Sequence, residues 1–177
     1  MKVMNLDEIK SLARNANGTI TKIYVHWTAG PYDVTFSDYH LNIDDKGIIY
    51  KTCSSLTEKK EHTWHRNTGA VGLALCCCED AIANAGYDAD FGACPPTVEQ
   101  IEKLSQLVAV LCSELGLAIN KDNVMTHEEA AMIDGYGPYS GDPETRWDLW
   151  YLPDSDGKMK SGGDVIRGKA IWYLENK

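Results

Sequence analysis

Residues 70–77 read AVGLALCC, an apolar run with no polar residue in it. Strands that are buried on both faces, as in the parallel centre of a sheet, have this continuous apolar character, whereas half-exposed strands alternate apolar and polar residues. We therefore expect a central β-strand over residues 70–77. The three cysteines 76–78 are then expected in the strand interior and not in a metal site.

Further strands are predicted on both sides of this run. Residues 21–27 read TKIYVHW, a β-branched and aromatic stretch that ends at an Ala-Gly-Pro sequence. Residues 39–43 and 47–50 flank a short Asp-Asp-Lys-Gly turn, which predicts a hairpin. A short strand is expected over residues 123–126.

Helices are indicated at three places. Thr97 followed by Gln100 matches a capping box, apolar residues then recur at three- and four-residue steps, and Gly116 closes the run. Residues 6–16 and 164–175 are also predicted to be helical. Together these elements predict one α/β (α+β) domain over residues 1–177, with a central mixed β-sheet flanked by helices.

Two stretches have no regular pattern. Residues 79–96 contain two glycines and two prolines and are expected to form a long loop, and residues 128–154 are expected to be irregular. Within the second stretch, Glu128 and Glu129 are interpreted as part of a solvated face; the alternative is that one of them supports a ligand residue of a site at His127. His40 and His62 are interpreted as structural or surface residues.

Composition excludes several classes of function. The chain has 177 residues, 17 Lys+Arg against 26 Asp+Glu and a net charge of −9, without a basic stripe, so we expect no nucleic-acid partner. No apolar run approaches the ~18 residues of a membrane span, so no membrane insertion is expected. The N-terminus shows no signal-peptide-like run, which predicts synthesis in the cytoplasm. The six cysteines lack CxxC spacing and are expected to be free thiols.

Two histidines lie at the ends of predicted strands, where functional sites are common. His26 lies near the end of one predicted strand, and His127 directly follows another. Side chains at strand ends are held by the sheet yet open to loop-lined clefts, which suits metal ligands and catalytic groups. Asp148 is an available acidic partner. Spacing alone leaves two interpretations open, a metal site assembled from distant residues or hydrogen-bonded structural histidines.

A resemblance favours the first interpretation. The stretches YVHWTA (24–29), DYHLNI (38–43), HTWH (62–65), VGLAL (71–75) and THEE (126–129) occur in one order. This order resembles the zinc-dependent N-acetylmuramoyl-L-alanine amidases of the type 2 family, which includes phage lysozyme-like endolysins and peptidoglycan recognition proteins. The resemblance covers about residues 20–152. It implies a mixed sheet flanked by helices and hydrolysis of the amide between N-acetylmuramic acid and the L-alanine of the stem peptide.

The resemblance also implies a ligand set for one Zn²⁺ ion. Its histidine ligands match His26 and His127. The third ligand, a Cys or Asp two residues after a catalytic Lys, matches Asp148, with Arg146 at the position of the Lys. A shift in the alignment would make Asp142 the ligand instead.

Other positions of the family match residues around the cleft. Some members use a catalytic Tyr on the strand before the hairpin, which matches Tyr39, and this strand would place it on one face with Leu41 and Ile43. Other members use a Glu on the central strand, where this chain has Ala74, so the resemblance is to the tyrosine-type, endolysin-like branch. Three further residues are expected to bind substrate: Trp64, His65 and Asn67.

The expected function is that of a zinc-dependent peptidoglycan hydrolase with peptidoglycan or muropeptides as its partner, acting as a monomer. The alternative is a recognition module that binds muropeptides without cutting them. An endolysin made in the cytoplasm and released to the cell wall, a cytoplasmic recycling amidase and a delivered antibacterial effector all fit the sequence.

Overall fold

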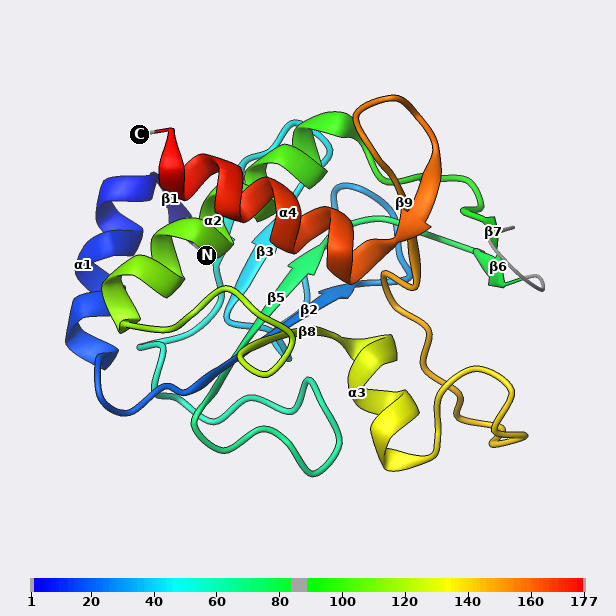
Figure 1. Ribbon diagram of the computed structural model, residues 1–177, viewed down its shortest axis with the longest axis horizontal. Coiled ribbons are helices and arrows are strands. Elements are labelled where there is room, and N and C mark those ends of the chain that lie inside the picture. Colours follow the sequence, from blue (N-terminus) through cyan, green and yellow to red (C-terminus); the bar gives the residue numbers. More distant parts are fainter. Residues whose placement is uncertain (1, 84–88, 177) are drawn as a thin grey trace.

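The computed structural model describes residues 2–83 and 89–176. The strands of its main sheet are β1 (Lys2–Met4), β2 (Lys22–Trp27), β3 (Leu41–Ile43), β4 (Ile49–Lys51), β5 (Ala70–Leu75) and β8 (Val124–Thr126). In the described part of the chain they form one six-stranded sheet in the order β1-β4-β3-β5-β2-β8 (Figure 1). Strands β3, β5, β2 and β8 are parallel, and β4 runs antiparallel to β3 and β1. The mixed sheet, the hairpin and the central position of β5 confirm the prediction.

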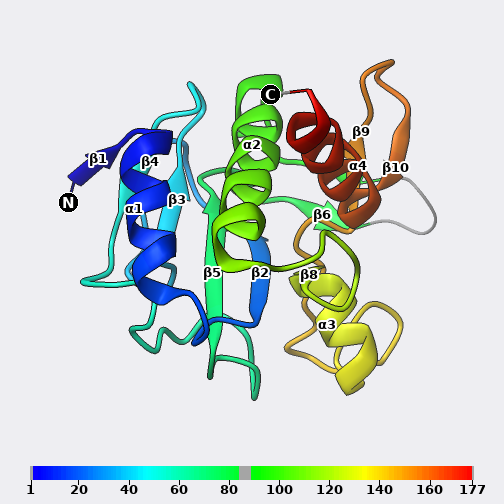
Figure 2. The same ribbon diagram turned by 60° about the vertical axis from the view of Figure 1, so that its left-hand side comes forward.

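Helices α1 (Leu6–Ala16), α2 (Val98–Leu115) and α4 (Gly162–Glu175) lie together on one face of this sheet (Figure 2). The predicted capping box of α2 is present, since the Thr97 side chain accepts from the Gln100 backbone and the Gln100 side chain accepts from the Thr97 backbone. Gly116 ends the helix with φ 69°, a left-handed conformation that favours glycine. The mixed α/β fold with helices flanking the sheet is therefore as expected.

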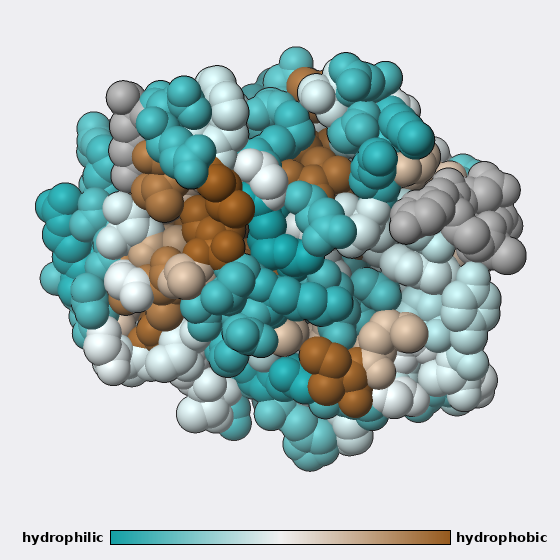
Figure 3. All heavy atoms as spheres, viewed as in Figure 1, coloured by the Kyte–Doolittle hydropathy of each residue, from teal (hydrophilic) through white to brown (hydrophobic). Residues whose placement is uncertain are grey.

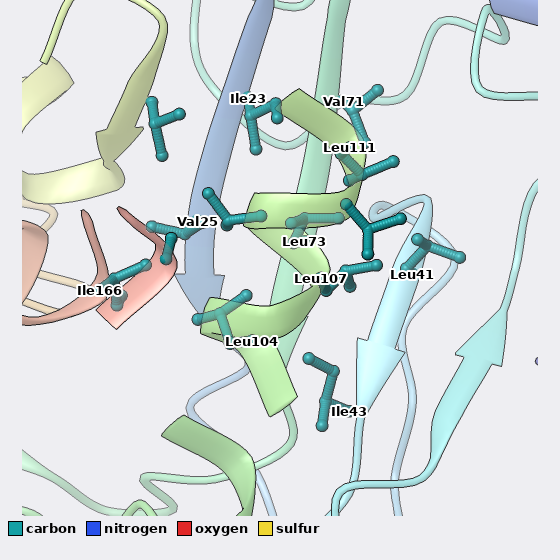
Figure 4. Packing of buried hydrophobic residues seen from close by; sticks show 14 of the residues in the cluster. Ile23, Val25, Leu41, Ile43, Val71, Leu73, Leu104, Leu107, Leu111 and Ile166 are labelled. Carbon is teal, nitrogen blue, oxygen red and sulfur yellow. The ribbon is translucent and has the colours of Figure 1, made fainter. Parts of the chain in front are cut away.

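Alternation along β2 and β5 separates the two faces of the sheet. One set of strand side chains packs against α2 and forms the main core with it, which Figure 4 shows from close by. This core includes Ile23, Val25, Val71 and Leu73 of the strands and Leu104, Leu107 and Leu111 of α2. On the opposite face Tyr24 packs with Ala70, Met125 and Ala130. Because side chains alternate along a strand, His26 lies on the same face as Tyr24, away from α2. This second face carries the polar residues of the candidate site.

The expectation that residues 128–154 are irregular was wrong in part. Helix α3 (His127–Asp134) occupies the first part of this stretch, and β9 (Tyr151–Pro153) pairs with β10 (Met159–Ser161). Thr126 and Glu129 form a capping box at the start of α3, and Gly135 ends the helix with φ 83°. The same Thr-x-x-Glu signal stands in the sequence and would have predicted this helix.

The interpretation of Glu128 and Glu129 as a solvated face was also wrong. Both residues are buried, and Glu129 forms an ion pair with Arg167 of α4 at 2.7 Å between Nη1 and Oε2. Burial of a carboxylate is tolerated where a partner charge and hydrogen bonds compensate for lost hydration. The ion pair ties the start of α3 to α4.

Three smaller differences concern strand boundaries. Strand β1 was not predicted. Strand β5 ends at Leu75, so cysteines 76–78 follow the strand instead of lying inside it. All three cysteines are buried. In the expected loop over 79–96, β6 (Ile82–Ala83) pairs with β7 (Ala89–Asp90). Residues 84–88 of that loop lie outside the described residues.

Among the described residues, none of the helices combines the length and apolarity needed to cross a bilayer. Figure 3 shows the outer face of the helices as mostly hydrophilic, with apolar areas where α1, α2 and α4 meet and over α3. The exposed apolar residues of α3 include Met132 and Ile133.

The six cysteines lie within the described residues and are free, as expected. Cys94 is partly exposed, whereas the other five are buried. Burial raises the pKa of the Cys76 and Cys112 thiols to about 12. Because the thiolate is the nucleophile, we expect iodoacetamide at mildly alkaline pH to modify Cys94 first in the native protein, as measured by peptide mass spectrometry. Equally fast native modification of Cys112 would contradict the burial described here.

Candidate metal centre and its groove

His26 and His127 come together because their strands are parallel neighbours. Strand β2 pairs with β8 in a register that places Val25 opposite Thr126, so the next residue of each chain segment is one of the two histidines. Both strands reach their carboxyl ends at the same edge of the sheet, where sites of open α/β sheets commonly lie. His26 is still in β2, while His127 is the first residue of α3.

Asp148 reaches the two histidines from the loop that follows α3. The backbone N–H of Glu128 donates to the carbonyl oxygen of Asp148 at 3.4 Å, and the next residue, Leu149, is fully buried. These two contacts hold the loop against the start of α3. The carboxylate oxygen Oδ2 lies 3.2 Å from Nδ1 of His127 and 3.3 Å from Nδ1 of His26, and the two Nδ1 atoms are 3.1 Å apart.

The charge states of His26 and Asp148 suit a cation. Burial lowers the pKa of His26 to about 4, so its imidazole is neutral at pH 7. Burial alone would raise the pKa of the Asp148 carboxyl, but the charge of His127 and hydrogen bonds from both imidazoles lower that pKa overall. A neutral imidazole and an ionised carboxylate are the forms that bind a divalent metal ion.

The spacing of the three donor atoms also fits a metal ion. A tetrahedral zinc ion with bonds of about 2.0–2.1 Å requires ligand atoms roughly 3.4 Å apart. The observed separations of 3.1, 3.2 and 3.3 Å are close to that value. Throughout residues 2–83 and 89–176, His26, His127 and Asp148 are the one group of three or more such side chains that could hold a metal.

Asp142, the alternative third ligand, lies apart from this cluster. Its Oδ1 accepts from the backbone N–H of Glu144 at 2.8 Å, and its backbone carbonyl accepts from the hydroxyl of Thr145. Asp142 therefore stabilises a turn in the wall of the groove. The geometry brings Asp148, and not Asp142, to the two histidines.

Each histidine has a polar neighbour at its other ring nitrogen. The hydroxyl oxygen of Thr63 lies 3.3 Å from Nε2 of His26, and the hydroxyl of Tyr136 lies 3.4 Å from Nε2 of His127. Neither Thr63 nor Tyr136 was predicted as a site residue. Thr63 belongs to the HTWH stretch of the resemblance, whereas no sequence signal pointed to Tyr136.

An open groove passes over the cluster in two adjoining hollows of about 690 and 460 Å³. The hollows share four lining residues: Glu61, His62, His127 and Arg146. The larger hollow contains the exposed aromatic residue Trp64, and the smaller one contains Tyr39 and Asp148. A substrate that fills both hollows would pass over His127 and Asp148.

Tyr39 lies in a bend before β3 and not on the strand, so its predicted alternation with Leu41 and Ile43 was wrong. Its ring centroid is 5.0 Å from that of His26, and its hydroxyl donates to the carbonyl oxygen of Trp27 at 3.5 Å. Burial, and then the charge of Asp148, raise the pKa of the Tyr39 phenol. The phenol therefore stays protonated at neutral pH.

Arg146 stands in the wall that the two hollows share. Its Nη1 donates to the carbonyl oxygen of Glu144 at 2.9 Å, and its Nη2 lies 3.3 Å from Oε2 of the same residue. The side chain remains 45% exposed, so its guanidinium can still contact a bound substrate. Arg146 lines the smaller hollow together with Tyr39, His127 and Asp148, and so adds a permanent positive charge to its wall.

The three residues expected to bind substrate all line the larger hollow. Trp64 is 60% exposed, and its ring lies 3.9 Å from that of His65, centroid to centroid. Asn67 has a structural task as well, because its Oδ1 accepts from the backbone N–H groups of His62 and Thr63 at 3.2 and 2.8 Å.

His62 was interpreted as structural or surface, and the structure buries it beneath the groove. Its ring packs on β5, where a Cβ at Gly72 would lie 2.5 Å from Cγ of His62. Burial is the largest cause that lowers the pKa of His62, so its ring is neutral. Nδ1 of His62 lies 2.9 Å from the hydroxyl oxygen of Thr63. His40, also buried, accepts from the Gly72 backbone N–H at its Nδ1.

A family model described as N-acetylmuramoyl-L-alanine amidase matches residues 16–144. The chain belongs to the N-acetylmuramoyl-L-alanine amidase family. It is a peptidoglycan amidase, which confirms the family and the enzyme class that the ordered motifs indicated. The match includes His26 and His127 but ends before Arg146 and Asp148. The position of Arg146 and Asp148 near His127 therefore comes from the structure and not from the family match.

Two solved structures are similar to this amidase over part of its length. One is the endolysin N-acetylmuramoyl-L-alanine amidase LysCS from Clostridium intestinale URNW, at 18% identity, with a TM-score of 0.45 and coverage of 64% of this chain and 72% of that chain. The other is the N-acetylmuramoyl-L-alanine amidase LysC from the same organism, also at 18% identity and a TM-score of 0.45, covering 64% and 74%. No curated protein matches the chain.

Proposed function

We propose that this amidase is zinc-dependent and that His26, His127 and Asp148 hold one Zn²⁺ ion. The observation that carries the proposal is the convergence of three buried donor atoms with tetrahedral spacing at the carboxyl ends of β2 and β8. Two imidazoles and one carboxylate are a common ligand set of catalytic zinc, which keeps a fourth position open. When bound, zinc supplies a Lewis acid for the amide carbonyl and lowers the pKa of a coordinated water to about 7.

The side chains around the cluster suit the hydrolysis of an amide. Arg146 would donate hydrogen bonds to the carbonyl oxygen as negative charge develops there. A guanidinium keeps its charge and its hydrogens in proteins, so Arg146 would not act as a general acid. Tyr39 would orient the attacking water through its hydroxyl. Its raised pKa favours this role over that of a general base, because the phenol retains its proton at neutral pH.

The shape of the groove suggests how the substrate lies. Exposed Trp64, with His65 beside it and Asn67 in the same wall, offers an aromatic surface on which a sugar ring could stack. We propose that the glycan occupies this larger hollow and that the stem peptide enters the smaller one. The amide between N-acetylmuramic acid and L-alanine would then cross the cluster between them.

We further propose an endolysin-like role, in which a monomer made in the cytoplasm acts on the cell wall after release. The tyrosine at position 39 and the absence of a glutamate at position 74 support the endolysin-like branch. A net charge of −9 gives no electrostatic attraction to anionic wall polymers, so binding would depend on the groove.

The direct test is dye release from purified peptidoglycan. We expect the metal-free protein, prepared with a chelator and verified by metal analysis, to be inactive and to recover when one equivalent of Zn²⁺ is added. Mg²⁺ serves as the control ion, because it prefers six oxygen ligands and should not restore activity. Full activity of the verified metal-free protein would refute the zinc proposal.

Arg146→Ala should lower kcat by about 10²–10³-fold while the bound zinc stays at one ion per chain, because a donor to the developing oxyanion is lost. Arg146→Lys should retain a larger share of kcat, since it keeps the positive charge. Wild-type kcat in both variants would show that Arg146 does not touch the reacting amide.

A further inference from the structure

A chain of polar contacts runs from the metal centre into the protein. Nδ1 of His26 faces His127 and Asp148, while its Nε2 lies 3.3 Å from the hydroxyl oxygen of Thr63. That oxygen is 2.9 Å from Nδ1 of His62. Thr63, His26 and His62 are all buried, so these contacts are shielded from solvent.

We infer that Thr63 and His62 are positioning residues that fix the tautomer and the orientation of His26 for metal binding. The inference rests on the proposed function, because it assumes that His26 binds the ion through Nδ1. A neutral imidazole has one N–H and one acceptor nitrogen. With Nδ1 as the ligand, Nε2 of His26 carries the hydrogen and donates it to Thr63.

This assignment determines the direction of the next hydrogen bond, between Thr63 and His62. The Thr63 hydroxyl, having accepted from His26, donates its own hydrogen to Nδ1 of His62, which must then be the acceptor. His62 therefore carries its N–H on Nε2. No other hydrogen bond opposes this tautomer, since Nε2 of His62 has no partner among the residues that the structure describes.

The surrounding loop is built to hold these two residues still. Asn67 accepts from the backbone N–H groups of both His62 and Thr63, and Gly72 leaves the space that the His62 ring fills. His127 has a more exposed outer contact of the same kind. The hydroxyl of Tyr136 lies 3.4 Å from Nε2 of His127, and Tyr136 lines the groove. Loss of such an outer hydrogen bond to a metal-ligating histidine typically weakens metal binding 10–100-fold.

The experiment compares Zn²⁺ dissociation constants, measured by competition with a chromophoric chelator, for the full chain. Thr63→Val removes the hydroxyl and keeps the shape, and we expect it to raise the dissociation constant by about 10–100-fold. Thr63→Ser keeps the hydroxyl and should restore the wild-type value to within about threefold, a rescue that a loss of packing would not show. Thr68→Val, at an exposed threonine of the same loop, is the matched control and should bind zinc like the wild type.

Equal affinity of Thr63→Val and Thr68→Val would overturn the inference. If Thr63→Val does not fold, long-range ¹H–¹⁵N NMR of the zinc-loaded wild type decides instead, because it reports which ring nitrogen carries the hydrogen. Nε2–H at both His26 and His62 is the expected result. Nδ1–H at His62 would refute the proposed series of hydrogen bonds. Failure of the wild type to bind zinc at all would refute the proposed function separately, before any variant is compared.

Discussion

Asp148→Ala is expected to remove zinc binding and to lower the rate of peptidoglycan hydrolysis about a thousandfold. Lewis-acid activation is worth several kcal/mol of transition-state stabilisation, and each ~1.4 kcal/mol corresponds to a factor of ten in rate. Asp148 is the single carboxylate within 3.3 Å of both imidazoles among the described residues. Dye release and zinc content per chain are the two measurements.

Asp142→Ala is the matched control for metal content. It removes a carboxylate from the same loop, but that carboxylate bonds to the backbone of Glu144 and not to a histidine. We expect this variant to retain one zinc ion per chain. Retention of zinc by Asp148→Ala together with its loss from Asp142→Ala would assign the ligand to Asp142 and reject the site described above.

The second large effect concerns stability. Arg167→Met should lower the free energy of unfolding of the metal-free protein by about 3–5 kcal/mol in urea titrations, because it removes the buried partner of the Glu129 carboxylate. The charge that remains near Glu129 is the exposed ammonium of Lys121, 3.5 Å from Oε1. Arg167 donates to both carboxylate oxygens of Glu129, at 2.7 and 2.9 Å, and to the carbonyl oxygen of Val124 at 3.0 Å.

A double variant separates the effect of the buried Glu129 charge from the loss of packing. Arg167→Met with Glu129→Gln removes both charges, while the glutamine oxygen can still accept from the Thr126 backbone as the glutamate does at 3.0 Å. We expect the double variant to be more stable than Arg167→Met alone. If both variants unfold at the same urea concentration, the buried charge is not the cause of the destabilisation.

Local signals in the sequence were sufficient for most of the elements. The capping box at Thr97 and the glycine at position 116 located α2, and the apolar run from Ala70 located the central strand. Such features depend on neighbours within a few residues, so they can be read without the fold. The one clear local signal that was overlooked is the capping box of α3 at Thr126 and Glu129.

Other features depend on residues that are distant in sequence. The burial of Glu129 could not be predicted, because the charge that compensates it, Arg167, arrives from a helix 38 residues further on. Tyr39 was placed on a strand because its neighbours are β-formers, but β3 starts only at Leu41. Its approach to His26 depends on how the bend packs over the end of β2.

The mixed sheet, the family and the two histidines at strand ends follow from the sequence, because each depends on local patterns or on motifs in a recognisable order. Asp148, and not Asp142, comes to these histidines only through the tertiary structure, which also brings Thr63 and His62 behind His26. Side chains separated by 101 and 122 residues meet through the parallel register of β2 and β8 and the path of one loop. Such convergence is a property of packing in space, which no spacing along the chain can express.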